Sequence, residues 1–363
     1  MLPFLCDMSD MVKQRFTAID FFCGGGGMTC GLRQSGIDVI AGVDFDPAVG
    51  ETYEFNNPGS KFINSDINIL PENYFEDKFG VKRDDDNLIL VGCSPCQYYS
   101  IINTDRTKSL KTKDLLMSFA RFIEYYRPGY VLVENVPGIV TNKDSVLPEF
   151  LNKLVSLGYG ETVDDIKRDV IDLSYYGVPQ SRRRFSLIAT RLPGISLCLP
   201  KPDAEQRRLR SCIGVTNGFP SIEAGHRDSS DFNHSCACLS DVGKQRMIRT
   251  HKNGGSRLDW ANDPQLQLAC YEGKDDSFTD NYGRMSWDKP APTITTKFLS
   301  ISNGRFGHPD EDRAISVREG AAIQTFPNTY VFKTTSMGNA AKIIGNAVPC
   351  EYARRLGHLI QSF

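Results

Sequence analysis

A short apolar run that ends in a tight turn limits the folds open to this chain. Residues 88–91 (LILV) are apolar throughout, which is typical of a strand buried on both faces of a parallel sheet. The run stops at Gly92, and the turn CSPCQ follows at once. Ligands of open α/β sheets bind beyond the carboxyl ends of the strands, where such a turn lies. We therefore expect an α/β fold with a doubly wound, mostly parallel sheet and its chemistry at this turn.

Cys96 is the candidate nucleophile of this turn. It follows Pro95 near an expected helix start, where a thiolate is stabilised and exposed. Two other interpretations stay open at this point: an inert core cysteine, and a redox pair with Cys93 in the C-x-x-C pattern. No thioredoxin-like sequence surrounds the pair, which disfavours redox chemistry.

Composition and length indicate the class of protein. The 363 residues contain no run of eighteen apolar residues, and the first sixteen lack the features of a signal peptide. Eleven cysteines without framework spacing favour a reducing compartment, so we expect a cytoplasmic protein without a membrane partner. The formal net charge of −2 means that any surface for nucleic acid must be local.

Three segments in the first part of the chain predict a nucleotide-like cofactor. An apolar strand over residues 16–22 leads directly into CGGGGMTCGL, where Gly24 and Gly26 fit a ligand-cradling turn but Thr29 replaces the third Gly. Asp44 ends a second strand, a position that commonly binds ribose hydroxyls. Asp66 follows a third strand and is placed to reach an adenine amino group. The alternative is that these residues are only turn and cap residues.

Two further segments carry charged side chains at strand ends. Residues 128–133 predict a buried strand that delivers Glu134, and a carboxylate there is costly unless it is paired or used. Arg182 and Arg184 precede a strand over residues 185–189, and their alternation predicts that they share a face suited to a carboxylate or phosphate. Helical spacing further predicts helices over residues 113–126, 146–157 and 239–251.

Taken in order, these segments resemble the cytosine-5 DNA methyltransferase family. FFCGGGGMTCGL resembles its cofactor motif, SPCQ its catalytic loop, ENV its glutamate motif and QSRRRF its Q-x-R-x-R motif. YGRMSWDKPAPTITT, GRFGHPDEDRAISVREGAAIQTFP and IIGNAVP resemble the later motifs. The resemblance extends from Phe16 to Leu359 in the family's own order, which makes it far more specific than SPCQ alone.

The resemblance implies a set of catalytic roles. Cys96 would add covalently to a cytosine flipped out of the duplex, and Glu134 would act at ring nitrogen 3. Arg182 would orient Glu134 or approach the base, and Arg184 would help to hold the substrate near Cys96. The methyl donor would be S-adenosylmethionine, with S-adenosylhomocysteine as product.

The resemblance also implies binding residues, without a metal. The cofactor would be bound by ten residues: Phe22, Gly24, Gly26, Asp44, Phe45, Asp66, Ile67, Pro95, Leu115 and Asn346. Double-stranded DNA would contact Gln97, Ser100, Arg284, Thr293 and Ile294. An H-x-C-x-C cluster at His234, Cys236 and Cys238 suggests zinc, but no fourth ligand stands at a usual spacing.

We expect two domains and one activity from these observations. Residues 1–190 plus 337–363 would form the catalytic and cofactor-binding domain, and residues 191–336 the target-recognition domain. The activity would be site-specific DNA (cytosine-5-)-methyltransferase, in a monomer of the prokaryotic or phage modification type, with a cognate restriction endonuclease as a functional partner. The rivals are a tRNA cytosine-5 methyltransferase, a catalytically silent DNA-binding module and, from the Gly-rich turn alone, a dinucleotide oxidoreductase.

Overall fold

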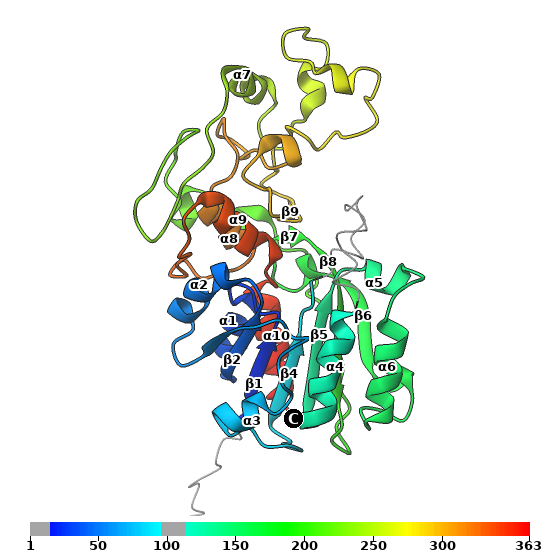
Figure 1. Ribbon diagram of the computed structural model, residues 1–363. Coiled ribbons are helices and arrows are strands. Elements are labelled where there is room, and N and C mark those ends of the chain that lie inside the picture. Colours follow the sequence, from blue (N-terminus) through cyan, green and yellow to red (C-terminus); the bar gives the residue numbers. More distant parts are fainter. Residues whose placement is uncertain (1–14, 96–113) are drawn as a thin grey trace, which may run out of the picture.

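A computed structural model describes residues 15–95 and 114–363 of the chain. Within these residues, seven strands form one sheet in the order β3-β2-β1-β4-β5-β8-β6 (Figure 1). In that order the strands span Lys61–Asn64, Asp38–Asp44, Thr17–Phe21, Leu88–Gly92, Tyr130–Asn135, Arg183–Thr190 and Lys167–Asp172. The strands β3 to β5 run parallel, whereas β8 runs antiparallel to β5 and β6. The predicted doubly wound, mostly parallel sheet is confirmed.

The strand order reverses at β1, which pairs with β2 on one side and with β4 on the other. In doubly wound sheets such a reversal opens a crevice beyond the carboxyl ends of the two strands. The Gly-rich turn after β1 and the CSPCQ turn after β4 therefore begin at the same crevice.

Helices cover both faces of the sheet because the strand side chains on each face are apolar. Ala18 and Ile89 pack on one face beneath α1 (Gly27–Gln34) and α10 (Cys350–Ile360). Ile19 and Leu90 pack on the other face, against α3 (Tyr74–Phe79), α4 (Leu115–Tyr126) and α6 (Leu147–Ser156). Figure 1 shows α4 and α6 side by side on that face.

The remaining helices are short or lie above the sheet. The other α-helices are α2 (Gly50–Asn56), α5 (Gly138–Thr141), α7 (Asp241–Arg249), α8 (Val317–Ile323) and α9 (Met337–Asn346). The 3₁₀ helices span Pro47–Val49, Val163–Asp165, Leu173–Tyr175, Leu209–Ser211, Val215–Asn217, Arg257–Trp260, Ala269–Tyr271 and Ile301–Asn303. The helices predicted over residues 113–126, 146–157 and 239–251 correspond to α4, α6 and α7.

Buried arginines organise residues 191–336, the loop-rich region that lies above the sheet in Figure 1 and is called the upper region below. Within the described residues, its one strand pair joins β9 (Ala291–Pro292) to β7 (Gln180–Ser181). Irregular backbone leaves carbonyl groups that regular structure would otherwise satisfy, and a guanidinium offers five donors. Four fully buried side chains meet this need by donating to backbone carbonyls: Arg257, Arg284, Arg313 and Arg318.

The last two helices divide between the two parts of the molecule. Ile343 and Ile344 of α9 share an apolar cluster with Ala321 and Ile323 of α8, whereas α10 packs beneath the sheet. Figure 1 accordingly shows α9 beside α8 and α10 behind the strands. The predicted domain boundaries at residues 190 and 337 stay a prediction. By those boundaries α9 belongs to the catalytic domain, but it packs against α8 of the upper region.

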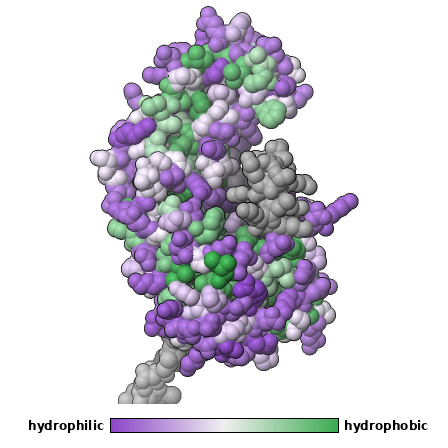
Figure 2. All heavy atoms as spheres, viewed as in Figure 1, coloured by the Kyte–Doolittle hydropathy of each residue, from purple (hydrophilic) through white to green (hydrophobic). Residues whose placement is uncertain are grey.

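Within residues 15–95 and 114–363, no helix combines the length and the apolar character needed to cross a bilayer. Hydrophilic residues cover most of the face seen in Figure 2.

Candidate active site

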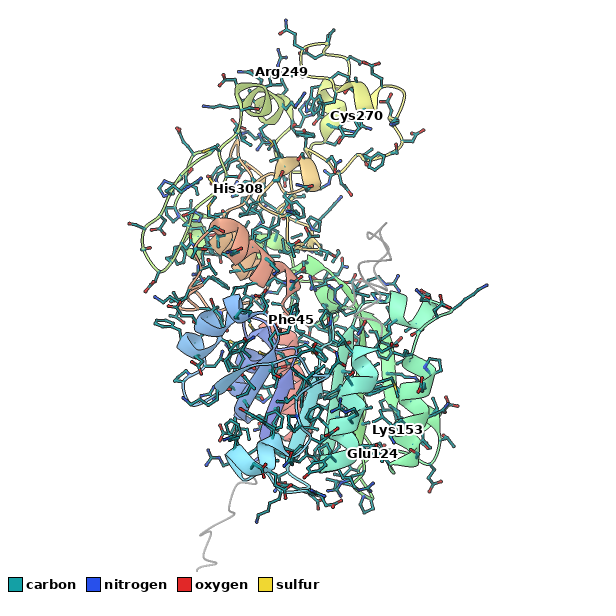
Figure 3. All side chains as sticks on the ribbon, viewed as in Figure 1. Phe45, Glu124, Lys153, Arg249, Cys270 and His308 are labelled. Atoms are coloured by element: carbon teal, nitrogen blue, oxygen red, sulfur yellow. The ribbon has the colours of Figure 1, made fainter. Side chains whose placement is uncertain are left out.

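The carboxyl ends of four neighbouring strands border one cavity of about 340 Å³. Its walls come from the turns after β1, β2, β4 and β5 and from the end of α9. Phe45, labelled in Figure 3, marks its rim where the sheet meets the upper region. The volume lies in the range of small-molecule sites, roughly 300–1,000 Å³.

The Gly-rich turn leaves room on its cavity side. Phe22 and Gly24 both line the cavity in the left-handed conformation, with φ of 63° and 50°. A Cβ atom at Gly24 would meet nothing within 4 Å, so the space beside it is open to a ligand. At Gly26 a Cβ would lie 2.7 Å from Asn57 Nδ2 and from the Tyr330 hydroxyl. Gly26 therefore serves close packing and is not among the lining residues of the cavity, so its contact with the cofactor stays a prediction.

Asp44 is fixed at the end of β2 by two backbone amides. Its carboxylate accepts hydrogen bonds from Gly24 N at 3.0 Å and from Asp46 N at 2.9 Å. Burial raises the pKa of Asp44, and the two amide donors offset part of that effect. The neighbouring Phe45 ring is 69% exposed, so it is available to a planar ligand. Both residues line the cavity, and their predicted contact with the cofactor stays a prediction.

Asp20 is a cavity residue that the sequence analysis missed. It lies on β1, is fully buried, and accepts a hydrogen bond from the Thr29 hydroxyl at 2.7 Å. Its other oxygen, Oδ1, has no hydrogen-bond partner. Burial raises the pKa of Asp20 to about 7, and the Thr29 bond acts in the opposite direction. A carboxyl directly ahead of a Gly-rich turn was the available signal.

The remaining predicted cofactor residues lie only partly at the cavity. Pro95 and Asn346 line it, whereas Asp66, Ile67 and Leu115 are not among its lining residues in the described chain. Asp66 is exposed and accepts from the Asn68 backbone and side-chain amides at 2.9 Å. Ile67 is 4% exposed within the apolar core. Asp66 is thus not a lining residue of this cavity, and an Asx turn occupies one of its carboxylate oxygens, Oδ1.

Glu134 and Arg184 form an ion pair at the cavity wall. Arg184 Nε lies 2.9 Å from Glu134 Oε1, and both side chains are mostly buried. The antiparallel pairing of β5 with β8 sets Glu134 opposite Ser186, which brings Arg184 to the carboxylate from the neighbouring strand. Arg184, rather than Arg182, therefore orients Glu134.

Arg182 has a different role from the one predicted. It lies between β7 and β8, where strand alternation does not apply, and it is 3% exposed. It donates to the carbonyls of Ile294 at 3.1 Å, Gly345 at 3.3 Å and Ala347 at 3.2 Å. Burial holds the pKa of Arg182 well below its usual range. The expectation that Arg182 orients Glu134 is corrected, because the ion pair to Glu134 comes from Arg184. The expectation that the two arginines face the same site agrees with the structure, since both line the cavity.

The first residues of the predicted catalytic turn form part of the cavity wall. Cys93, Ser94 and Pro95 line the cavity, and Ser94 accepts a hydrogen bond from Asn135 Nδ2 at 3.2 Å. Asn135, next to Glu134, is a second cavity residue that the sequence analysis did not single out. The predicted residues Cys96, Gln97 and Ser100 lie outside the described residues.

Two of the predicted DNA contacts are buried. Arg284 is fully buried, and it donates to four backbone carbonyls and to Asp312, which contradicts the predicted phosphate contact. Ile294 is also fully buried, which contradicts a direct contact with DNA. Thr293 is half-buried and donates its hydroxyl to the Ser181 carbonyl at 2.7 Å. Arg284 instead ties loops of the upper region to one another, and the Thr293–Ile294 segment is bound to residues 180–182.

The H-x-C-x-C cluster is tied into the protein. The two ring nitrogens of His234 lie 2.8 Å from the Ser316 hydroxyl and 2.9 Å from the Pro220 carbonyl. The Cys236 thiol donates to the Glu223 carbonyl. In the part of the chain that the structure describes, no group of three His, Cys, Asp or Glu side chains is placed to hold a metal ion.

The sequence model of C-5 cytosine-specific DNA methylases matches residues 16–362. Because the match covers nearly the whole chain, this protein belongs to that family, and it is a DNA cytosine-5-methyltransferase.

Relatives and solved structures agree with this assignment. The chain is 36% identical over 353 residues to the type II methylase M.HgiDII of Herpetosiphon aurantiacus, covering 95% of each chain. It is 31% identical over 358 residues to the type II methyltransferase M1.BsuMI of Bacillus subtilis, covering 94% of this chain and 79% of that one. A solved E. coli prophage protein, described as a DNA modification methyltransferase, has the same fold with a TM-score of 0.69 at 20% identity, covering 96% and 99% of the two chains.

Proposed function

We propose that this enzyme transfers the methyl group of S-adenosylmethionine to carbon 5 of one cytosine within a short sequence of double-stranded DNA. One observation carries the proposal: segments far apart in the sequence meet at a single cavity. The Gly-rich turn, Asp44, the start of the catalytic turn and the Glu134–Arg184 pair all line it. A cofactor subsite and a candidate catalytic carboxylate therefore adjoin each other.

The cavity residues fit the proposed cofactor. A cationic amino group suits the unpartnered oxygen of buried Asp20, because a buried carboxylate gains most from a charged donor. The open space beside Gly24 would admit the methionine part, Asp44 would bind the ribose, and the exposed Phe45 would hold the adenine. Phe22, Pro95 and Asn346 would complete the pocket. The product S-adenosylhomocysteine would occupy the same residues.

The chemistry at the base follows from the side chains. Cytosine carbon 5 is a weak nucleophile, so the Cys96 thiolate first adds to carbon 6 and shifts the electron pair of the ring double bond to carbon 5. Glu134, held by Arg184, favours that addition by holding a proton at ring nitrogen 3. Bound S-adenosylmethionine supplies the electrophilic methyl group that carbon 5 takes up. A base then removes the carbon 5 proton, and the sulfur leaves carbon 6 as the double bond re-forms.

The reaction requires the target base to leave the duplex. The thiolate must reach the face of the ring, which is stacked inside double-stranded DNA, so the cytosine is flipped into the site. The upper region supplies the sequence readout, and Gln97 and Ser100 contact the DNA beside Cys96. We further propose that the enzyme acts as a monomer on the DNA of the cell that makes it, as half of a restriction–modification pair. The type II names of its relatives support this last point.

Transfer of labelled methyl groups tests the proposal. Purified enzyme with labelled S-adenosylmethionine is expected to label duplex DNA and to leave tRNA unlabelled, and Cys96→Ala is expected to abolish the label. S-adenosylmethionine should raise the melting temperature, whereas NAD should not. Label in tRNA alone would assign the RNA reaction, and DNA binding without label would indicate a silent binding module.

A further inference from the structure

Three buried polar side chains form a junction between the cofactor cavity and the upper region. They are Gln180, Arg182 and Gln324, and each is at most 3% exposed. Gln180 Nε2 donates to Gln324 Oε1 at 2.7 Å, which joins the start of β7 to the end of α8. We call these three residues the polar junction.

On its cofactor side the polar junction binds the backbone at the end of α9. Gln324 Nε2 donates to the carbonyls of Ile344 at 2.6 Å and Ala347 at 3.2 Å. Arg182 donates to the carbonyls of Gly345 and Ala347. Gly345 and Ala347 flank Asn346, and all three line the cavity. The polar junction therefore sets the position of one cavity wall.

On its other side the polar junction binds the segment that follows β9. Gln180 Oε1 accepts from Ile294 N at 3.0 Å, and Arg182 Nη1 donates to the Ile294 carbonyl at 3.1 Å. The backbones also touch, because a Cβ atom at Gly345 would lie 2.4 Å from the Thr295 carbonyl carbon. A shift of either backbone would therefore press on the other or leave buried donors and acceptors unpaired, which is costly in a dry interior.

We propose that Gln324 is a positioning residue that couples cofactor binding to DNA binding. Gln324 is fully buried and is not among the lining residues of the cavity, but it holds the cavity wall and, through Gln180, the Ile294 segment of the upper region. A bound cofactor that fixes the cavity wall would also fix the Ile294 segment and so raise the affinity for DNA. Because coupling between two sites is reciprocal, bound DNA would raise the affinity for the cofactor by the same factor. This inference rests on the proposed function, since it requires that both ligands bind.

The test compares wild type with Gln324→Met, which keeps the side-chain length but removes every hydrogen bond of the amide. The probe is a DNA duplex that carries the enzyme's recognition motif with the target cytosine unmethylated. Its dissociation constant is measured with and without saturating S-adenosylhomocysteine. We expect the cofactor product to tighten duplex binding by about tenfold in wild type, within the range of about 5–150-fold for coupled sites. In Gln324→Met we expect a ratio within about twofold of one.

Two further variants separate coupling from general loosening of the fold. Gln180→Met breaks the same junction from the other side and should lower the ratio in the same way. Thr250→Val removes the hydroxyl that accepts from Trp260, an equally buried hydrogen bond away from the cavity, and should leave the ratio unchanged. Melting temperature and circular dichroism establish that each variant is folded.

The outcomes are distinguishable. A ratio in folded Gln324→Met and Gln180→Met equal to that of wild type would overturn the coupling role, as would a wild-type ratio of one. A similar loss of the ratio in Thr250→Val would assign the effect to loosening and would equally overturn it. If the wild-type enzyme bound neither the duplex alone nor S-adenosylhomocysteine alone, that result would instead contradict the proposed function.

Discussion

Among the described residues, Glu134 has one ion pair, with Arg184 at the cavity wall, and that pair sets its direction. Its Oε1 atom meets Arg184 at 2.9 Å in a geometry that makes no hydrogen bond. We propose that this carboxyl meets a ring nitrogen of the substrate, and that Arg184 acts by setting the direction of the carboxyl.

Replacing Glu134 by Gln tests this role. Glu134→Gln is expected to lower kcat by about 10²–10⁴-fold, the usual contribution of a general acid or base, while the duplex Kd changes by less than about threefold. The matched control is Glu124→Gln, since Glu124 is an exposed residue that pairs with Lys153 far from Phe45 (Figure 3). Equal activity of Glu134→Gln and Glu124→Gln would remove Glu134 from the mechanism.

Asp20 predicts a pH dependence of stability. Its folded-state pKa of about 7 lies above the ordinary 3.8, so the folded state binds the proton more tightly than the unfolded chain does. The resulting stabilisation is complete below about pH 3.8 and is lost as the pH rises through about 7. Without cofactor, Asp20→Asn should therefore gain melting temperature relative to wild type between pH 5 and pH 8. Parallel melting curves over that range would contradict a buried, unpaired carboxyl.

Motif residues next to strands were the predictable part of the site, because a strand end fixes where they lie. Gly24, Asp44 and Glu134 all line the cavity for this reason. The roles predicted for Arg182 and Arg284 were wrong. Both donate to backbone carbonyls of loops, and the sequence has no periodic pattern that shows which loop carbonyls need a donor.

Helix α1 is held to α10 by a glycine contact. A Cβ atom at Gly31 would lie 2.1 Å from the Cys350 carbonyl oxygen and 2.5 Å from Ala353 Cβ. Gly31→Ala should therefore force the helices apart and lower the free energy of unfolding by about 1–3 kcal/mol. Gly338→Ala is the matched control, because this α9 glycine has only the Ser336 hydroxyl within 4 Å, at 3.8 Å. Denaturant unfolding that gave equal values for both variants would contradict the close packing.

The first turn of α8 depends on a buried carboxylate. Burial alone would raise the pKa of Glu319, but hydrogen bonds from Arg313 and Ser316 hold it at about 2. The corresponding stability is present above about pH 4.5 and is lost as the pH falls toward 2. Glu319→Gln leaves Arg313 buried with a neutral partner, so we expect a loss of about 3–5 kcal/mol at pH 7 that shrinks in acid. A loss independent of pH would contradict the ion pair.

The sheet elements were predictable because each is an apolar run with a turn at its end. The 191–336 region was not, because its order depends on arginines that reach backbone far away in the sequence. Arg257, for example, donates to the carbonyls of Lys274, Ser277 and Phe278. Such contacts leave no pattern in local hydropathy.

The molecule as a whole is two unlike parts joined by buried contacts. The polar junction and the apolar cluster shared by α8 and α9 connect the upper region to the cofactor cavity. With a formal net charge of −2, the whole chain supplies little unspecific attraction for DNA. We therefore propose that specific binding comes from local contacts rather than from the overall charge of the chain.

The most direct measurement is conversion-based sequencing of DNA from a methylation-free host that expresses this protein, beside a host that expresses Cys96→Ala. The account predicts 5-methylcytosine at one short motif in the wild-type DNA and none in the variant, with both proteins folded at equal levels. Absence of 5-methylcytosine with folded wild-type protein would contradict DNA methylation by this chain. Methylation that survived in Cys96→Ala would contradict the covalent mechanism.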